Sequence, residues 1–106
     1  MTQIEKGSTN VYTDLGYENP DAMRVRSQLA SKIGEIIHAR KLTQMAAAEL
    51  LGIPQPKLSN MLRGQFRGIS ATKMVECLTK LGRNVEIVVK SAPGSKAAGH
   101  VSVVFA

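Results

Sequence analysis

Residues 44–61, QMAAAELLGIPQPKLSNM, are the stretch that decides the fold of this chain. Apolar residues recur at helical spacing on both sides of Gly52, with almost no loop between the two segments. Glycine readily adopts the left-handed conformation that a tight turn between helices needs, and the small side chain of Ala48 leaves room for the second helix to cross. The stretch therefore predicts a helix-turn-helix. Its predicted inward residues are Leu51, Leu58 and Met61.

The ends of the two helices are also marked in the sequence. Thr43 is a good N-cap for the first, because its hydroxyl can accept a hydrogen bond from a first-turn amide. Pro54 and Pro56 are compatible with the start of the second, since first-turn amides have no intrahelical acceptor to lose. Gly64 is the predicted stop. In the loop that follows, Phe66 is predicted to anchor in the core.

The outward face of the second helix consists of hydrogen-bonding side chains, none of them acidic. Glutamine and asparagine can bond an adenine edge at N6 and N7, while lysine and arginine can reach guanine or phosphate. We therefore predict that this face binds DNA in the major groove. The alternative is an ordinary solvated helix face. The residues concerned are Gln55, Lys57, Ser59, Asn60 and Arg63.

Positive charge is concentrated around this motif. The chain has a formal net charge of +6. Residues 40–73 hold six lysines and arginines against one acidic residue, Glu49, whereas residues 1–39 hold four basic and five acidic residues. Such an excess is the electrostatic footprint that binding to phosphates requires, although a run of charge is often only a solvated surface.

Length and composition limit the class of protein. A chain of 106 residues fits one domain, and its low aromatic content, 4%, implies a core of aliphatic side chains and methionine. We find no apolar run near the roughly 20 residues of a membrane span and no signal-peptide segment, which predicts a cytoplasmic protein. The single cysteine, Cys77, excludes an internal disulfide and is predicted to be a buried apolar residue; the alternative is a reactive or metal-binding thiol.

Two more helices are predicted beside the motif. The sequence Asn-Pro-Asp at 19–21 is typical of a helix start, and the apolar spacing after it predicts about 20 helical residues, ending at Arg40 or Lys41. Ser70 can cap a further helix that Gly82 ends. On it, Glu76 and Lys80 are predicted to pair one turn apart. Its predicted inner face is formed by Met74, Cys77, Leu78 and Leu81.

Beyond Gly82 the apolar period changes from helical spacing to two. Residues 84–90, NVEIVVK, and 100–105, HVSVVF, predict β-strands, and the segment between them is rich in Pro, Gly, Ser and Ala. Because an isolated hairpin is marginally stable, its apolar face needs a cover, and a second copy of the chain would provide one in a four-stranded sheet. Alternatively, the strands pack only on their own helices, or the last ten residues are loose.

The overall prediction is a mainly α fold: a compact bundle of four to five helices with a C-terminal β-hairpin or strand pair, forming a dimer. Residues 1–18 form an N-terminal arm, 19–82 the DNA-binding domain, and 83–106 the dimerisation strands. The arm is polar with interspersed Tyr12, Leu15 and Tyr17, so it cannot build a core alone. We expect disorder there; the alternatives are a strip packed on the domain and a segment that orders on a partner.

The motif resembles a known family. The segment LTQMAAAELLGIPQPKLSNMLRGQF, residues 42–66, is similar to the helix-turn-helix of Cro/C1-type, or XRE, regulators. With NVYTDLG, NPDAMRVRSQLASKI, FRGIS and LGRNVEIVVK, the pattern from 10 to 90 resembles the HigA-like antitoxin group within it. That resemblance implies a homodimer that binds a palindromic operator, represses its own operon and neutralises a RelE-like or HigB-like toxin that cleaves mRNA on the ribosome. The alternative is a stand-alone or phage-derived regulator without a toxin.

The resemblance also assigns roles to individual positions. Gln44 matches the glutamine that opens the motif, contacts phosphate and supports the next helix. Gln55 matches the first base-contacting position, with Pro56 and Asn60 at others; proline departs from the polar residue common there and offers only van der Waals contact. The family tends to contact the DNA backbone at the positions of Lys57, Arg63 and Arg67. Its outward position also allows Lys57 to reach guanine as well as phosphate. Together the two arguments predict base contacts from Gln55, Pro56, Asn60 and Lys57, and phosphate contacts from Gln44, Ser59, Arg63 and Arg67.

Catalysis is not predicted. His38 and His100 are isolated in the sequence, and we find no Ser-His-Asp or Cys-His set, no phosphate-binding glycine loop and no metal-ligand spacing. The sequence therefore predicts no cofactor and no metal. A repressor that occludes its promoter and a protein that binds and neutralises a toxin remain the two hypotheses, and both can hold together.

Overall fold

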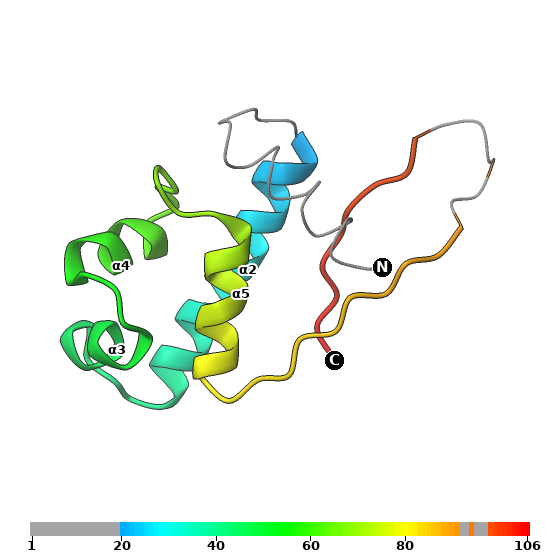
Figure 1. The fold of residues 1–106 in the computed structure, drawn as a ribbon. Helices are drawn as coiled ribbons and strands as arrows, with labels where there is room; N and C mark the ends of the chain where they lie inside the picture. The colour runs from blue at the N-terminus through cyan, green and yellow to red at the C-terminus, as the bar shows by residue number, and fades with distance from the viewer. Residues whose placement is uncertain (1–19, 92–93, 95–97) are drawn as a thin grey trace.

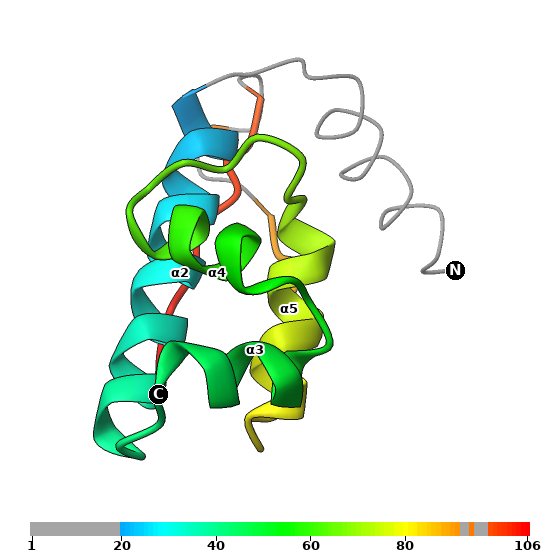
Figure 2. The same cartoon turned by 90° about the vertical axis from the view of Figure 1, so that its left-hand side faces the viewer.

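The structure, a computed structural model, describes residues 20–91, 94 and 98–106. Four α-helices lie in these ranges: α2 Pro20–Ala39, α3 Gln44–Leu51, α4 Gln55–Leu62 and α5 Ala71–Lys80. In Figures 1 and 2, α2 and α5 run side by side in the same direction, and the short helices α3 and α4 lie against them. The helical prediction is confirmed, including the helix-turn-helix; the predicted arm, residues 1–18, lies outside the described residues.

The predicted caps explain where the helices begin and end. The Thr43 hydroxyl accepts a hydrogen bond from the amide of Ala46 at 3.0 Å, and the Ser70 hydroxyl accepts one from the amide of Lys73 at 3.1 Å. Between α3 and α4, Gly52 has φ 71° and ψ 31°, the left-handed conformation expected of the turn. The chain reverses there within a few residues, which fixes α4 across α3.

The core fills the space between the α2–α5 pair and the helix-turn-helix. Each helix contributes one apolar stripe to it, as helical spacing requires. The inward residues predicted for the motif, Leu51, Leu58 and Met61, are buried, which confirms their placement. The largest fully buried side chains are Ile33, Leu51, Leu58, Met61, Met74 and Cys77.

The C-terminal strands were predicted wrongly. Residues 84–90 and 100–105 are extended, but the structure assigns no strand within the ranges it describes. A strand is stabilised by a ladder of backbone bonds to a neighbour and by cover for its apolar face. The first segment has no such cover: Ile87 is 80% exposed, Val88 74% and Val89 79%. Within the ranges that the structure describes, the alternating pattern is thus present without a hydrogen-bonded neighbouring strand.

Residues 100–105 instead lie along α2. His100 Nδ1 is 2.9 Å from a carboxylate oxygen of Asp21, and the Lys32 ammonium lies 4.8 Å from the centre of the Phe105 ring. Between these contacts, Val103 packs against the core. The end of the chain therefore follows the alternative that it packs on its own helices.

The predicted pair between Glu76 and Lys80 on α5 is wrong. The Glu76 carboxylate instead forms an ion pair with the Lys73 ammonium at 3.4 Å, and the Lys80 ammonium donates a hydrogen bond to the carbonyl oxygen of Leu51. Among the helices that the structure describes, none is both long and apolar enough to cross a membrane.

Candidate nucleic-acid interface

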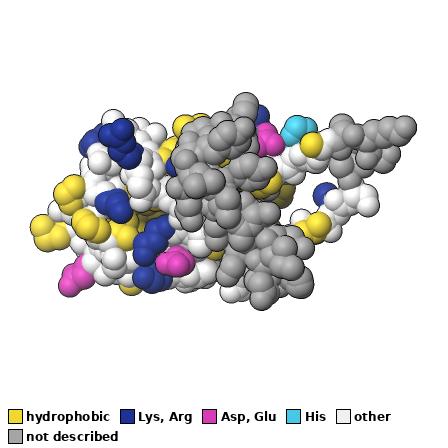
Figure 3. Space-filling view, turned by 45° about the horizontal axis from the view of Figure 1, so that its top comes forward, with side chains coloured by type: hydrophobic (Ala, Val, Ile, Leu, Met, Phe, Trp, Pro, Cys, Tyr) yellow, Lys and Arg dark blue, Asp and Glu magenta, His cyan; other side chains and the backbone are white. Residues whose placement is uncertain are grey.

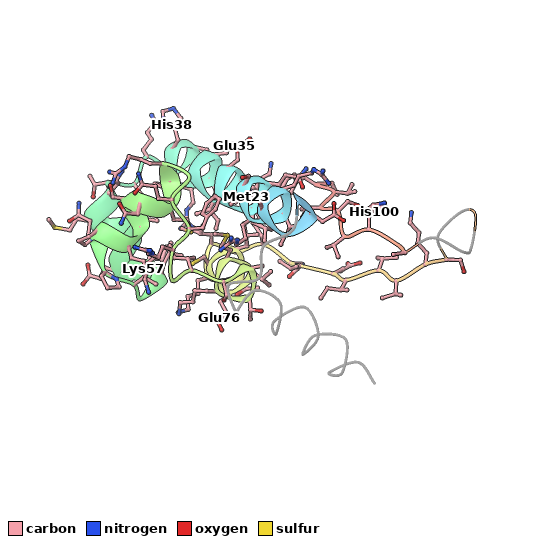
Figure 4. The ribbon with its side chains drawn as sticks, turned by 90° about the horizontal axis from the view of Figure 1, so that it is seen from above. Met23, Glu35, His38, Lys57, Glu76 and His100 are labelled. Carbon is pink, nitrogen blue, oxygen red and sulfur yellow. The ribbon has the colours of Figure 1, made fainter. Side chains whose placement is uncertain are left out.

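The outer face of α4 carries most of the predicted DNA-contacting side chains. Leu58 and Met61 point into the core, so the opposite side of the helix faces solvent. Gln55, Pro56 and Lys57 are exposed in its first turn, and Arg63 is exposed at its end. Ser59 and Asn60 are half-buried. Figure 4 shows Lys57 at the outer surface of the helix-turn-helix. The turn at Gly52 thus presents this face as the sequence predicts.

Three of the predicted residues form one hydrogen-bonded group. The Arg63 guanidinium donates to the Ser59 hydroxyl at 2.9 Å and to the side-chain oxygen of Asn60. An amide oxygen has two lone pairs and the amide nitrogen two hydrogens, so Asn60 keeps the capacity to bond a base. The sequence spacing, three and four residues apart, allowed this group to be foreseen, but it was not predicted.

The beginnings of α3 and α4 carry no negative charge. Neither helix has an acidic residue in its first turn. Gln44 is exposed at the start of α3, next to the Thr43 cap. Amides in a first helical turn point outward and carry partial positive charge, so they attract phosphate oxygens. Gln44 therefore lies where a phosphate contact is chemically favourable.

The loop after α4 presents Arg67 from a tight turn. Phe66 and Ile69 are buried, whereas Arg67 between them is exposed. The amide of Ile69 donates to the carbonyl oxygen of Phe66 at 2.9 Å, and Gly68 has φ 76°. The prediction that Phe66 anchors this loop is confirmed by its burial.

Arg26 on α2 is a residue that the sequence analysis missed. It is the buried charged residue of the described chain, 6% exposed, and its guanidinium donates to the backbone oxygens of Phe66 and Ile69. The signal was available: Arg26 stands in the helical series 26, 30, 33, 37, whose other members are buried apolar residues. A charged residue on an inward stripe indicates a specific partner.

Basic side chains lie on this face and in the segments before and after the helix-turn-helix. Lys57 is exposed on α4, Arg63 at its end and Arg67 in the loop after it, while Arg40 and Lys41 are exposed just beyond the end of α2. Figure 3 shows Lys and Arg side chains gathered at the helical end of the molecule, with fewer acidic ones among them. Exposed cations around a polar helix raise the local concentration of a polyanion and orient its approach. Exposed cations attract the phosphates of a nucleic acid. They would repel a metal cation, and they offer no apolar surface to a small apolar ligand.

The described residues offer little catalytic chemistry. No group of three or more His, Cys, Asp or Glu suitable for a metal ion occurs among them. Cys77 is buried, as predicted, and burial raises the pKa of its thiol, which disfavours the reactive thiolate. Figure 4 shows His38 and His100 far apart, and His100 is engaged with Asp21.

Comparisons with known proteins agree with this geometry. A family model described as a helix-turn-helix domain matches residues 11–90. Among solved structures, the chain is similar to one called a putative XRE family transcriptional regulator, with 36% identity and a TM-score of 0.74. The match covers 81% of this chain and 97% of that one. No curated protein matches the chain.

Proposed function

This chain belongs to the XRE family of helix-turn-helix transcriptional regulators, and we propose from that premise that it is a sequence-specific repressor. The family is a class of DNA-binding regulators rather than of enzymes. The observation that carries the proposal is the solvent-facing side of α4, which is polar, not acidic, and bordered by exposed arginines. Lying in the major groove, this helix would occlude a promoter that overlaps the operator.

The side chains divide into two groups by the contacts they would make. Gln55 and Asn60 supply the amides for base edges, while Pro56 and Lys57 complete the base-facing side. Gln44, Ser59, Arg63 and Arg67 would hold phosphates on either side of the groove and so set the position of α4. Sequence preference then depends on the first group, and the salt dependence of binding on the second.

The test compares specific and random DNA. A preferred duplex is first selected from a random library with the wild-type protein. Gln55→Ala should then cost roughly 1 to 3 kcal/mol of binding to that duplex and relax the preference at one base pair. Gln65→Ala is the matched control, because it removes the same amide from the loop outside α4. Equal loss on selected and random duplexes would count against base recognition by Gln55.

We also propose that the repressor is a homodimer joined through residues 84–90. This proposal is favoured by the exposure of Ile87, Val88 and Val89. Antiparallel pairing of the segment with its own copy, centred on Val88, sets Ile87 opposite Val89 and Glu86 opposite Lys90 of the partner subunit. Opposite charges facing across a strand pair are favourable and like charges unfavourable, so the segment is complementary to itself in this register. Two α4 helices would then meet two half-sites of a palindrome.

A charge exchange tests the register. Glu86→Lys places lysine against lysine and should shift sedimentation equilibrium toward the monomer, whereas Glu86→Lys with Lys90→Glu should restore the dimer. Glu76→Lys makes the same charge change on α5, outside the segment, and should leave the association unchanged. A monomeric wild type, or a double variant as weak as the single one, would reject the pairing.

The antitoxin role is the finer proposal and is supported by the resemblance of residues 10–90 to HigA-like antitoxins. The contact with a RelE-like or HigB-like toxin would come from residues 1–18 or from the C-terminal segment. Deleting residues 1–18 and measuring co-purification with the product of the neighbouring gene distinguishes them, since full retention excludes the arm. A neighbouring gene that encodes no toxin would favour a stand-alone or phage-derived regulator.

A further inference from the structure

Arg26 joins α2 to the loop that carries Arg67. One nitrogen of its guanidinium, Nη1, lies 3.4 Å from the carbonyl oxygen of Phe66 and 3.3 Å from that of Ile69. The guanidinium carbon also lies 5.4 Å from the centre of the Phe66 ring. Only 6% of Arg26 is exposed. The side chain is thus enclosed by the turn it binds and cannot itself contact a duplex.

The turn from Phe66 to Ile69 has two fixed ends and an exposed middle. Its ends are buried and joined by the bond from the Ile69 amide to the Phe66 oxygen, and Gly68 takes the positive φ of 76° that the bend requires. Arg26 binds the carbonyl oxygens at both ends. The direction in which Arg67 leaves the protein therefore depends on a contact made from α2.

We propose that Arg26 is a positioning residue for DNA binding. It holds the 66–69 turn in one conformation, so that Arg67 can contact a phosphate without the turn having to become ordered during binding. This inference rests on the proposed DNA-binding function. Ordering a long side chain and its loop during association costs binding free energy that a preformed turn avoids. An arginine suits this place because its planar, weakly hydrated group can stack on an aromatic ring and donate several bonds from a buried position.

Lysine cannot replace these features. Its ammonium is a strongly hydrated point charge, which is costly to bury and cannot donate to both carbonyl oxygens with the planar geometry of the guanidinium that lies over the Phe66 ring. Arg26→Lys keeps the charge of the protein but loses the geometry. We expect it to weaken binding to DNA by roughly three- to tenfold, the range that corresponds to ordering one long side chain, and to reduce the contribution of Arg67.

The experiment is a double-mutant cycle on DNA binding. Wild type, Arg26→Lys, Arg67→Ala and the double variant are titrated with a random-sequence duplex at several salt concentrations. Both single variants should bind more weakly and with a shallower salt dependence. The double variant should bind no more weakly than Arg67→Ala, because no side chain is left to position. In the control cycle, Arg26→Lys and Lys57→Ala should be additive.

Two further measurements distinguish a loss of positioning from a loss of folding. Thermal unfolding of each variant shows whether Arg26→Lys is folded at the temperature of the titration. Phe66→Leu removes the ring beneath the guanidinium while keeping an apolar anchor, and it should also be non-additive with Arg67→Ala; it takes the place of Arg26→Lys if that variant is unfolded.

The outcomes separate the inference from the proposed function. Additive effects of Arg26→Lys and Arg67→Ala, or of Phe66→Leu and Arg67→Ala where that pair is used, overturn the positioning role while DNA binding stands. An Arg67→Ala variant that binds like wild type overturns it too, because there is then no contact to position. A wild type that binds no duplex rejects the DNA-binding function and this inference with it.

Discussion

The ammonium group of Lys80, at the end of α5, donates a hydrogen bond of 3.1 Å to the carbonyl oxygen of Leu51, at the end of α3. Carbonyls in a last helical turn lack intrahelical partners and carry partial negative charge, so a cation there is favourable. The contact ties α5 to the turn before α4, as Arg26 ties α2 to the loop after it. The candidate recognition helix is therefore held from both ends by the scaffold.

Removing the Lys80 contact should destabilise the protein. We expect Lys80→Ala to lower the free energy of unfolding by about 1 kcal/mol, since the bond satisfies a helix-terminal carbonyl with a charged donor. Urea denaturation measures this. Lys73→Ala is the control, because Lys73 forms only a surface ion pair with Glu76, and such pairs contribute about 0 to 1 kcal/mol. A larger loss for Lys73→Ala would contradict the importance of the Leu51 contact.

Gly52→Ala tests the turn itself. A side chain at φ 71° is strained, and we expect a loss of about 1 to 2 kcal/mol in the free energy of unfolding. The added Cβ would also lie 3.3 Å from Nζ of Lys80, but that flexible end can move away. The cost should therefore be nearly the same in a Lys80→Ala background. If it disappears there, crowding rather than backbone strain explains the glycine.

The features predicted correctly from sequence are those that depend on neighbours a few residues away. Thr43 and Ser70 cap their helices because an N-cap bonds an amide three residues on, and Gly52 makes the turn because of its own backbone. The predicted partner of Lys80 was Glu76, four residues away, but its ammonium binds the carbonyl oxygen of Leu51 on another helix. A contact between residues that far apart in the sequence depends on how the helices pack, which periodicity does not specify.

The same distinction applies to the C-terminal segment and the candidate site. Alternation predicts strands at 84–90 and 100–105, but a strand also needs a partner, and the alternation does not say which one. The exposure of Gln55 and Lys57 was predictable from the helical face. The inward position of Arg26 was predictable in the same way, but its partners were not, because the carbonyl oxygens of Phe66 and Ile69 lie in another part of the chain.

Arg63 and Arg67 should differ in their effects on DNA binding. Either alanine variant should reduce the slope of log affinity against log salt by about one unit, the contribution of one phosphate contact. Arg63 also holds the side chain of Asn60. Arg63→Ala should therefore lower the ratio of selected to random binding as well, whereas Arg67→Ala should leave that ratio unchanged. Titrations on both duplexes measure the two quantities, and identical specificity ratios would show that Asn60 needs no support from Arg63.

The contact between His100 and Asp21 should be visible in the titration of the carboxylate. The hydrogen bond from His100 is the main cause that holds the pKa of Asp21 below its ordinary value of 3.8, and the bond from Arg24 adds a smaller effect. A lowered carboxylate pKa means that the contact stabilises the fold above pH 3.8 and that this stabilisation is lost as the pH falls through the lowered pKa. The contact of the C-terminal segment with α2 should therefore weaken as the pH falls through the lowered pKa of Asp21.

His100→Ala should raise the pKa of Asp21 toward 3.8, and Arg24→Ala should raise it less, as followed by NMR of the side-chain carboxyl carbon. In the same spectra, the signals of Val103 and Phe105 should shift together with the Asp21 titration, because both residues belong to the segment that His100 joins to Asp21 on α2. A pKa unaffected by His100→Ala would mean that the segment does not rest on α2 in solution. The segment would then be available, like residues 84–90, to a second copy of the chain.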